Sequence, residues 1–162
     1  MLLMTEAVIE LGSNLLDREK NIKSAIEAIE RLPFTNVVKL SSLYETEPFG
    51  VPDKQDNYIN CCVKIETALL AETLIGCCLG IEAAMGRVRR FKNAARIIDV
   101  DLLLYGDKNV NTSDLQLPHP RILERAFVLV PLSDIYKDGK TPCFDFSENL
   151  KVLDTSGVKK YK

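Results

Sequence analysis

Two aspartates, Asp99 and Asp101, interrupt an otherwise apolar run between residues 97 and 105. The run is rich in β-branched and aliphatic residues and ends at a Tyr-Gly pair, so it predicts a buried strand. Side chains two residues apart on a strand point to the same face, with Cα atoms about 6.5 to 7 Å apart. The chain must therefore fold so that two carboxylates share one face of a mostly buried strand.

Two carboxylates this close require positively charged partners, because an unpaired buried carboxylate is costly and tends to take up a proton. One interpretation is ion pairing with the basic residues just upstream, which are Arg87, Arg89, Arg90, Lys92 and Arg96. The other is Mg²⁺, which is usually held at phosphoryl-transfer sites by one or two carboxylates and phosphate oxygens. The arginines would then bind phosphate, since a guanidinium matches its oxygens bidentately.

The composition predicts a single compact domain over residues 1–162, because 46% of the residues are hydrophobic and 27% are charged. The net charge of -2 argues against a nucleic-acid partner, which usually requires a basic protein. The first residues lack the basic start and length of a signal peptide, and no later run has the roughly 18 apolar residues of a membrane helix. We therefore expect a cytoplasmic protein without membrane contact.

The order of the expected elements is strand, helix, strand, strand, helix, strand. Their ranges are about 7–11, 17–31, 36–46, 58–67, 71–85 and 97–105. This βαββαβ order is typical of the ferredoxin-like α+β sandwich, with both helices on one face of the sheet and the other face left for ligands. A C-terminal extension should follow, with a hairpin or an edge strand after Gly106, a helical segment over 122–135, and a short hairpin or loose tail from about 136.

The strand expected over 58–67 alternates between apolar and polar residues. Its apolar positions, which must face the core, are Ile59, Cys61, Val63 and Ile65. Tyr58 and Asn60 therefore lie together on the opposite face, beside a long loop. An aromatic ring next to a carboxamide could stack on a flat polar ligand and hydrogen-bond to it.

Six segments follow one another within about the first 135 residues: L-G-S-N-L, S-S-L-Y-E-T-E-P-F-G, D-N-Y-I-N, I-E-A-A-M-G-R-V-R, R-I-I-D-V-D-L-L-L-Y-G and L-P-H-P-R-I-L-E-R-A-F-V-L-V-P-L. In this order they resemble the 6-hydroxymethyl-7,8-dihydropterin pyrophosphokinases of folate biosynthesis. The resemblance implies a ferredoxin-like fold and an enzyme that transfers pyrophosphate from ATP to the hydroxymethyl group of the pterin and releases AMP. Other enzymes of the folate pathway become candidate partners.

The resemblance also implies a role for each matching residue on the nucleotide side. Asp99 and Asp101 would hold two Mg²⁺ ions that bridge the ATP phosphates, and Asp99 would lie near the reacting hydroxyl. Arg87 and Arg96 would bind the phosphates as catalytic residues, with Arg89 assisting. The remaining ATP-binding residues would be Glu82, Leu102, His119 and Arg125, with Leu102 in the adenine pocket.

On the substrate side, the resemblance places the pterin ring between Tyr58 and Phe127. Asn60 would hydrogen-bond to the edge of the ring, and the backbone around Thr46, Glu47 and Phe49 would line the same pocket. Phosphoryl transfer mainly needs charge neutralisation and in-line positioning. Mg²⁺ and arginines supply the first of these and ring stacking the second.

Two alternatives come from other classes of protein. The first is a noncatalytic ferredoxin-like nucleotide- or RNA-binding module that stacks bases on Tyr58, but the acid pair would repel phosphate in the absence of metal. The second is a nucleotidyltransferase, which also combines Gly-Ser with an acid-x-acid strand. In those enzymes the acids closely follow the Gly-Ser pair, whereas here most of the domain separates Gly12-Ser13 from Asp99.

Overall fold

The computed structural model describes residues 2–48, 51, 53–87 and 91–162. Its elements, in chain order, are β1 (Thr5–Ser13), α1 (Arg18–Glu30), β2 (Thr35–Leu40), β3 (Tyr44–Thr46), β4 (Tyr58–Thr67), α2 (Ala71–Ala84), β5 (Asp99–Tyr105), β6 (Val110–Asn111), β7 (Gln116–Leu117), the 3₁₀ helix η1 (Ile122–Glu124), α3 (Ala126–Ile135), α4 (Ser147–Val152) and β8 (Lys159–Lys160). None of the described helices is long and apolar enough to cross a bilayer.

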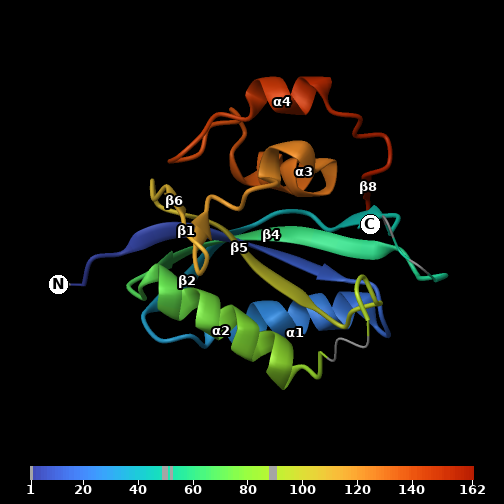
Figure 1. The fold of residues 1–162 in the computed structure, drawn as a ribbon, viewed down its shortest axis with the longest axis horizontal. Coiled ribbons are helices and arrows are strands. Elements are labelled where there is room, and N and C mark those ends of the chain that lie inside the picture. The colour runs from blue at the N-terminus through green and yellow to red at the C-terminus, as the bar shows by residue number, and fades with distance from the viewer. Residues whose placement is uncertain (1, 49–50, 52, 88–90) are drawn as a thin grey trace.

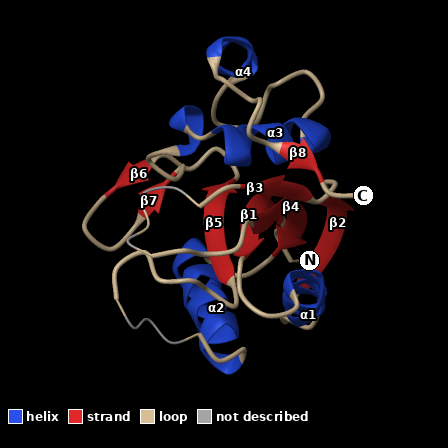
Figure 2. Ribbon diagram, turned by 90° about the vertical axis from the view of Figure 1, so that its right-hand side faces the viewer, coloured by secondary structure: helices blue, strands red, loops and turns tan. Residues whose placement is uncertain are grey.

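The main sheet has the strand order β5-β1-β4-β3-β8, and β2 pairs with β4 beside β3. All of these pairs are antiparallel. Helices α1 and α2 pack on one face of the sheet, and α3 and α4 lie on the opposite side (Figures 1 and 2). The fold is therefore the mixed α+β class that the element order predicted. Of the two alternatives after Gly106, the hairpin is the one found, formed by β6 and β7.

The face covered by α1 and α2 carries the larger hydrophobic core. The four apolar positions of β4 all belong to it, as their alternation predicted. Helix α1 begins after Asp17, whose carboxylate accepts a hydrogen bond from the backbone N–H of Lys20 at 3.1 Å. This cap satisfies one of the free N–H groups in the first turn, so the helix starts where the sequence indicated.

The opposite face is only partly open, which corrects the expectation that it is left for ligands. Val8 and Cys62 of the sheet pack with α3 in a second apolar cluster, and this cluster also contains the fully buried Phe146. After residue 136 the chain makes a turn bridged by Lys140 and Asp145 and continues into α4 and β8. This segment is thus packed on the domain, so of the two alternatives expected from about residue 136, a short hairpin or a loose tail, the loose tail is wrong.

The strand expected over 36–46 is divided into β2 and β3 by a local irregularity. The backbone N–H of Cys62 donates to the hydroxyl of Ser41 at 2.8 Å, and that of Ser42 donates to the carboxylate of Asp134 at 3.0 Å. Side chains thus replace backbone partners at this point, so the ladder is interrupted without leaving those N–H groups unpaired.

Strand β5 contains a β-bulge. Val8 pairs with Leu104 and Ile9 with Leu102, so Leu103 is an extra residue in β5. The two aspartates precede the bulge and keep the regular alternation. The bulge therefore shifts the register of the following apolar residues by one position relative to that of the aspartates.

Candidate active site

A cleft of about 800 Å³ is lined by residues of β1, β3, β4 and β5 and by the N-terminal end of α3. Acidic, basic, amide and aromatic side chains all contribute to its walls. The described lining residues are Glu10, Thr46, Glu47, Val51, Tyr58, Asn60, Lys92, Asn93, Arg96, Asp99, Asp101, Arg121, Glu124, Arg125, Ala126, Phe127, Asp154, Gly157 and Val158. Among the residues named from the sequence, the cleft thus brings together Thr46, Glu47, Tyr58, Asn60, Arg96, Asp99, Asp101, Arg125 and Phe127.

The acid pair faces this cleft. Asp99 and Asp101 both line it, while Val100 between them is buried in the core on the helix side. The two carboxylates therefore share one face of β5, as the strand period required. The cleft beside them leaves room for ligands.

Asp99 is already ion-paired within the protein. Nη1 of Arg96 lies 3.1 Å from both carboxylate oxygens of Asp99, and Nη1 of Arg87 lies 3.1 Å from Oδ1. The ion-pair interpretation therefore holds for this aspartate. Any phosphate or cation that binds here must compete with these contacts or share them.

Asp101 differs from its neighbour, because within the described part of the chain it makes no ion pair. Burial raises its pKa from 3.8 to about 6, and the negative charges of Asp99 and Glu82 add to this effect. This carboxylate is therefore available to a cation that enters the cleft, since a bound cation would offset the cost of its charge.

Glu10 adds a third carboxylate that sequence reasoning did not assign. It lies opposite Asp101 in the β1–β5 pairing, and its exposed fraction is 6%. Burial raises its pKa well above the ordinary value, the charges of Asp101 and Asp99 raise it further, and Arg125 opposes them. The period of β1 could have placed Glu10 on this face, but only the pairing of distant strands shows that it meets Asp101.

Glu82, in α2, contacts both Arg87 and the backbone of β5. Its Oε2 atom accepts the backbone N–H of Val100 at 3.0 Å and also ion-pairs with Arg87. Burial raises the pKa of Glu82, while the Val100 hydrogen bond and Arg87 lower it. Neither Glu82 nor Arg87 is among the described lining residues, and Arg87 connects Glu82 to Asp99 through its two ion pairs.

Two further residues named for the nucleotide also lie outside the described wall of the cleft. Leu102 belongs to the core on the helix side and is 7% exposed. His119 donates its backbone N–H to the carbonyl of Leu103 at 2.8 Å, and burial followed by the charges of Arg125 and Arg121 lowers its pKa. Phe49 and Arg89 lie outside the described residues.

Aromatic and amide groups form another part of the cleft. Tyr58, at the start of β4, and Phe127, in the first turn of α3, both line it. Asn60 is 3% exposed and donates from its side chain to the hydroxyl of Thr46 at 2.8 Å. A Cβ at Gly12 would lie 2.9 Å from Oδ1 of Asn60, so any larger residue there would displace this carboxamide from its present position.

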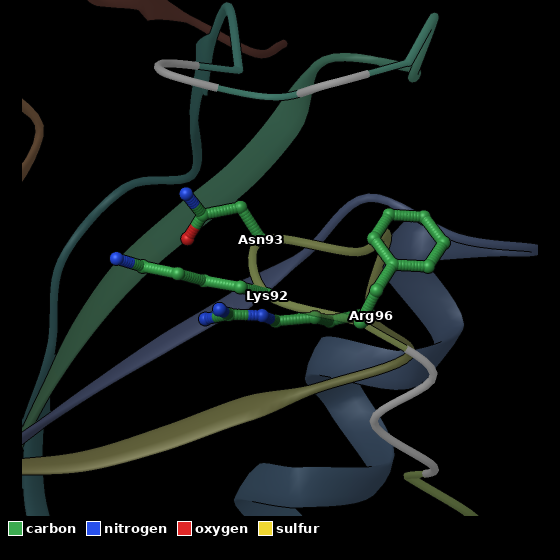
Figure 3. Close-up of a pocket in the computed structure, with 4 residues that line it drawn as sticks. Lys92, Asn93 and Arg96 are labelled. Carbon is green, nitrogen blue, oxygen red and sulfur yellow. The ribbon is translucent and has the colours of Figure 1, made fainter.

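Positive charge gathers at the rim. A pocket of about 470 Å³ is lined by Phe91, Lys92, Asn93 and Arg96. In Figure 3 the side chains of Lys92 and Arg96 extend in the same direction. Arg125 also lines the main cleft, and its guanidinium carbon lies 5.6 Å from the centre of the Phe127 ring. These cations can bind an anion beside the acid pair.

A buried asparagine joins the two loops that border the cleft. Asn14, which is 1% exposed, donates from its side chain to Oε1 of Gln55 at 3.0 Å and accepts the backbone N–H of Arg96 at 2.7 Å. Gln55 in turn donates to the carbonyl of Asn93 at 2.8 Å. The position of the Arg96 backbone thus depends on Asn14.

Comparison with known proteins gives one consistent result. Residues 8–137 match the family model described as 7,8-dihydro-6-hydroxymethylpterin-pyrophosphokinase. A 2-amino-4-hydroxy-6-hydroxymethyldihydropteridine pyrophosphokinase of Methylorubrum extorquens is 41% identical over 157 residues, which are 97% of this chain and 99% of the relative. The protein of the same name from Bacillus subtilis is 40% identical over 129 residues, which are 80% of this chain and 77% of the relative.

Solved structures share the fold. A crystal structure described as HPPK-DHPS in complex with substrates has a TM-score of 0.72 at 13% sequence identity. The alignment covers 96% of this chain and 46% of that one, so this chain spans less than half the length of the solved protein. A Plasmodium falciparum HPPK-DHPS structure has a TM-score of 0.74 at 14% identity and covers 99% of this chain and 49% of the other.

Proposed function

The chain belongs to the 7,8-dihydro-6-hydroxymethylpterin-pyrophosphokinase family, and we propose that the cleft around Asp99 and Asp101 is its active site. The reaction is the transfer of pyrophosphate from ATP to the hydroxymethyl group of 6-hydroxymethyl-7,8-dihydropterin, a step of folate synthesis. One observation carries the assignment to this cleft: the acid pair, the cationic rim and the aromatic residues Tyr58 and Phe127 all line it.

The residues at the acid pair fit Mg²⁺. Asp99 and Asp101 offer hard carboxylate oxygens on one face, and Asp101 makes no ion pair within the described residues. In the same part of the chain, no cluster of three or more His, Cys, Asp or Glu residues is arranged as a metal site. This agrees with Mg²⁺ sites that use one or two carboxylates and take their other oxygens from phosphates and water. We propose two ions, held by these aspartates, that neutralise charge on the ATP phosphates.

The arginines are proposed to bind the transferred phosphates. Arg96 and Arg87 point their guanidinium groups at Asp99, so they already lie beside the acid pair. When the nucleotide is bound, a phosphate oxygen can replace a carboxylate oxygen on the same guanidinium at little cost in geometry. Arg125 and Lys92 extend this positive field along the cleft. Arg89, which falls outside the described residues, stays a prediction for the same task, as do Glu82, His119 and Leu102 for the nucleotide.

The pterin is proposed to lie between Tyr58 and Phe127, with its edge toward Asn60. Asn60 is fixed by its bond to Thr46, so its amide is oriented before the ligand binds. A held ring keeps the hydroxymethyl oxygen in line with the β-phosphorus, so that AMP leaves as the new bond forms. Thr46 and Glu47 line this side, and Phe49 stays a prediction because it is not described.

The proposal also includes the fold type, a partner enzyme and the location of the protein. The strand order β5-β1-β4-β2, with antiparallel neighbours, supports a ferredoxin-like arrangement within a single domain. The fused HPPK-DHPS chains among the similar structures make another folate-pathway enzyme a reasonable partner. A cytoplasmic location would agree with the substrates.

Isothermal titration tests this function against the RNA-binding and nucleotidyltransferase alternatives. We expect a nonhydrolysable ATP analogue to bind more tightly with Mg²⁺ than without it, and the pterin to bind to the analogue complex. An RNA module would be indifferent to Mg²⁺, and a nucleotidyltransferase would not bind the pterin. Either result would overturn the assignment.

A further inference from the structure

We propose that Arg18, covered by the ring of Tyr161, is a positioning residue for the pterin side of the cleft. The inference depends on the proposed function, because it concerns how the substrate wall is held. Tyr161 and β8 lie beyond residue 137, where the match to the family model ends. Arg18, Glu45 and Asn57 lie within the matched residues, whereas the ring that packs on Arg18 lies outside them.

Arg18 connects two strands just outside the cleft. Its Nη1 atom lies 2.6 Å from Oε2 of Glu45 and donates to the backbone carbonyl of Asn57 at 2.9 Å. Asn57 directly precedes Tyr58, and Glu45 directly precedes Thr46. A single guanidinium therefore holds the residues next to the stacking ring and next to the hydroxyl that orients Asn60.

Arg18 does not line the cleft among the described residues, so it acts through these neighbours. Its side chain is 23% exposed and that of Glu45 is 34% exposed. A partly exposed ion pair is weakened by water, but a hydrogen bond from a charged donor to a backbone carbonyl adds directional restraint. The geometry points to control of position more than to overall stability.

Tyr161, in the segment over residues 154–162, lies over this arginine. The guanidinium carbon of Arg18 lies 5.6 Å from the centre of the Tyr161 ring. The backbone N–H of Tyr161 donates to the carbonyl of Leu43 at 2.8 Å, and β8 pairs with Tyr44 and Glu45 of β3. The ring is thus attached to the same strand whose Glu45 the arginine binds.

The same segment reaches the cleft. Gly157 and Val158 line it together with Thr46 and Glu47 of the β3 side. The chain continues from these cleft residues through β8 to Tyr161. The Tyr161 ring contacts Arg18, which in turn binds the carbonyl of Asn57. These contacts hold the proposed pterin side of the cleft. The Asp99 ion pairs, on the proposed nucleotide side, are formed by β5 and do not include Arg18.

The test compares dissociation constants for the pterin, measured with Mg²⁺ and a nonhydrolysable ATP analogue present, with those for the analogue alone. Arg18→Ala is expected to weaken pterin binding about tenfold or more, because it leaves Glu45 and the Asn57 carbonyl unpaired. Tyr161→Ala should weaken it about threefold to tenfold. Affinity for the ATP analogue should stay within about twofold in both variants.

Two further variants separate positioning from a general loss of structure. Tyr161→Phe should bind the pterin as the wild type does, because the contact with Arg18 uses the ring. Arg31→Ala, which removes an exposed arginine just after α1, should change neither affinity. The double variant of Arg18→Ala and Tyr161→Ala should bind no more weakly than Arg18→Ala alone, since both changes break one set of contacts.

The inference fails if Tyr161→Ala leaves pterin affinity unchanged, or if pterin and ATP analogue weaken equally. If Arg18→Ala does not fold, the comparison of Tyr161→Ala with Tyr161→Phe decides the matter. Failure of the wild type to bind the pterin would instead overturn the proposed function. The two failures are therefore distinguishable.

Discussion

Glu10 of β1 lies directly opposite Asp101 of β5, with Asp99 two residues further along the same strand. Glu10 is 6% exposed, and both neighbouring acids raise its pKa beyond the effect of burial. A strand register thus places a third carboxylate against the proposed Mg²⁺ ligands. Three carboxylates close together repel one another when they are ionised, so we expect them to lower the stability of the metal-free protein.

Replacement of Glu10 should stabilise the metal-free protein. The raised pKa means that Glu10 costs folding free energy whenever the pH exceeds the unfolded value, and that this cost vanishes in acid. Glu10→Gln should therefore raise the free energy of unfolding by about 1 to 3 kcal/mol at neutral pH. Urea unfolding in the presence of a chelator measures this. The gain should disappear below about pH 4, where Glu10 is mostly protonated in the unfolded state as well as in the folded one. A loss of stability at neutral pH would contradict the electrostatic account.

Asp101 should give the stability of the metal-free protein a pH dependence. Its pKa is raised from 3.8 to about 6, so the folded state favours the protonated form. The stability from this group is complete below about pH 4 and is lost as the pH rises to about 6. The wild type should lose about 2 to 3 kcal/mol relative to Asp101→Asn across that window. If the difference in free energy of unfolding between the two proteins stays the same at every pH, this pKa is excluded.

Loss of either proposed Mg²⁺ ligand should abolish most turnover. Asp99→Ala or Asp101→Ala removes an oxygen ligand and should lower the rate of pyrophosphate transfer at least about 100-fold, with folding nearly intact. AMP release gives the rate, and circular dichroism reports the fold. Asp114→Ala, at an exposed aspartate, is the matched control. Unchanged transfer in either site variant would end the metal assignment.

Removal of one stacking ring should separate the two substrates. Tyr58→Ala is expected to weaken pterin binding by about 1 to 3 kcal/mol, which is the usual contribution of an aromatic ring to stacking, and to spare ATP. Titration with each ligand measures the split. Phe34→Ala serves as the control, because Phe34 is 62% exposed and does not line the cleft. Equal losses for pterin and ATP would argue against the aromatic sandwich.

The buried Asn14 should matter more to stability than exposed asparagines do. Asn14→Ala removes the acceptor of the Arg96 backbone N–H and the donor to Oε1 of Gln55 and to the Asp56 carbonyl, so it should cost about 2 kcal/mol or more. Asn111→Ala, at an exposed position in β6, should change the free energy of unfolding by less than about 0.5 kcal/mol. Chemical denaturation compares the two variants. Similar costs would mean that the bonds of Asn14 to the two loops contribute little.

Local patterns predicted much of this fold. The bounds of β4, the Asp17 cap of α1 and the shared face of Asp99 and Asp101 all follow from side-chain periodicity and hydrogen-bonding chemistry over a few residues. Local patterns missed the break between β2 and β3, because Asp134, which helps to satisfy it, lies 92 positions away in the chain. They also missed the packing of the segment after residue 136. Its composition is mostly polar, but the ring of Phe146 is buried in the second apolar cluster.

The sequence by itself determined the chemistry of the site: an acid pair on one face of a strand, arginines beside it, and a tyrosine next to an asparagine. Tertiary structure alone decided what surrounds that chemistry. The β1–β5 register brings Glu10 to Asp101, and the pairing of β8 with β3 brings Tyr161 to Arg18. The physical reason is that the direction of a side chain along a strand follows from local backbone geometry, whereas strand partners are selected by packing between distant parts of the chain.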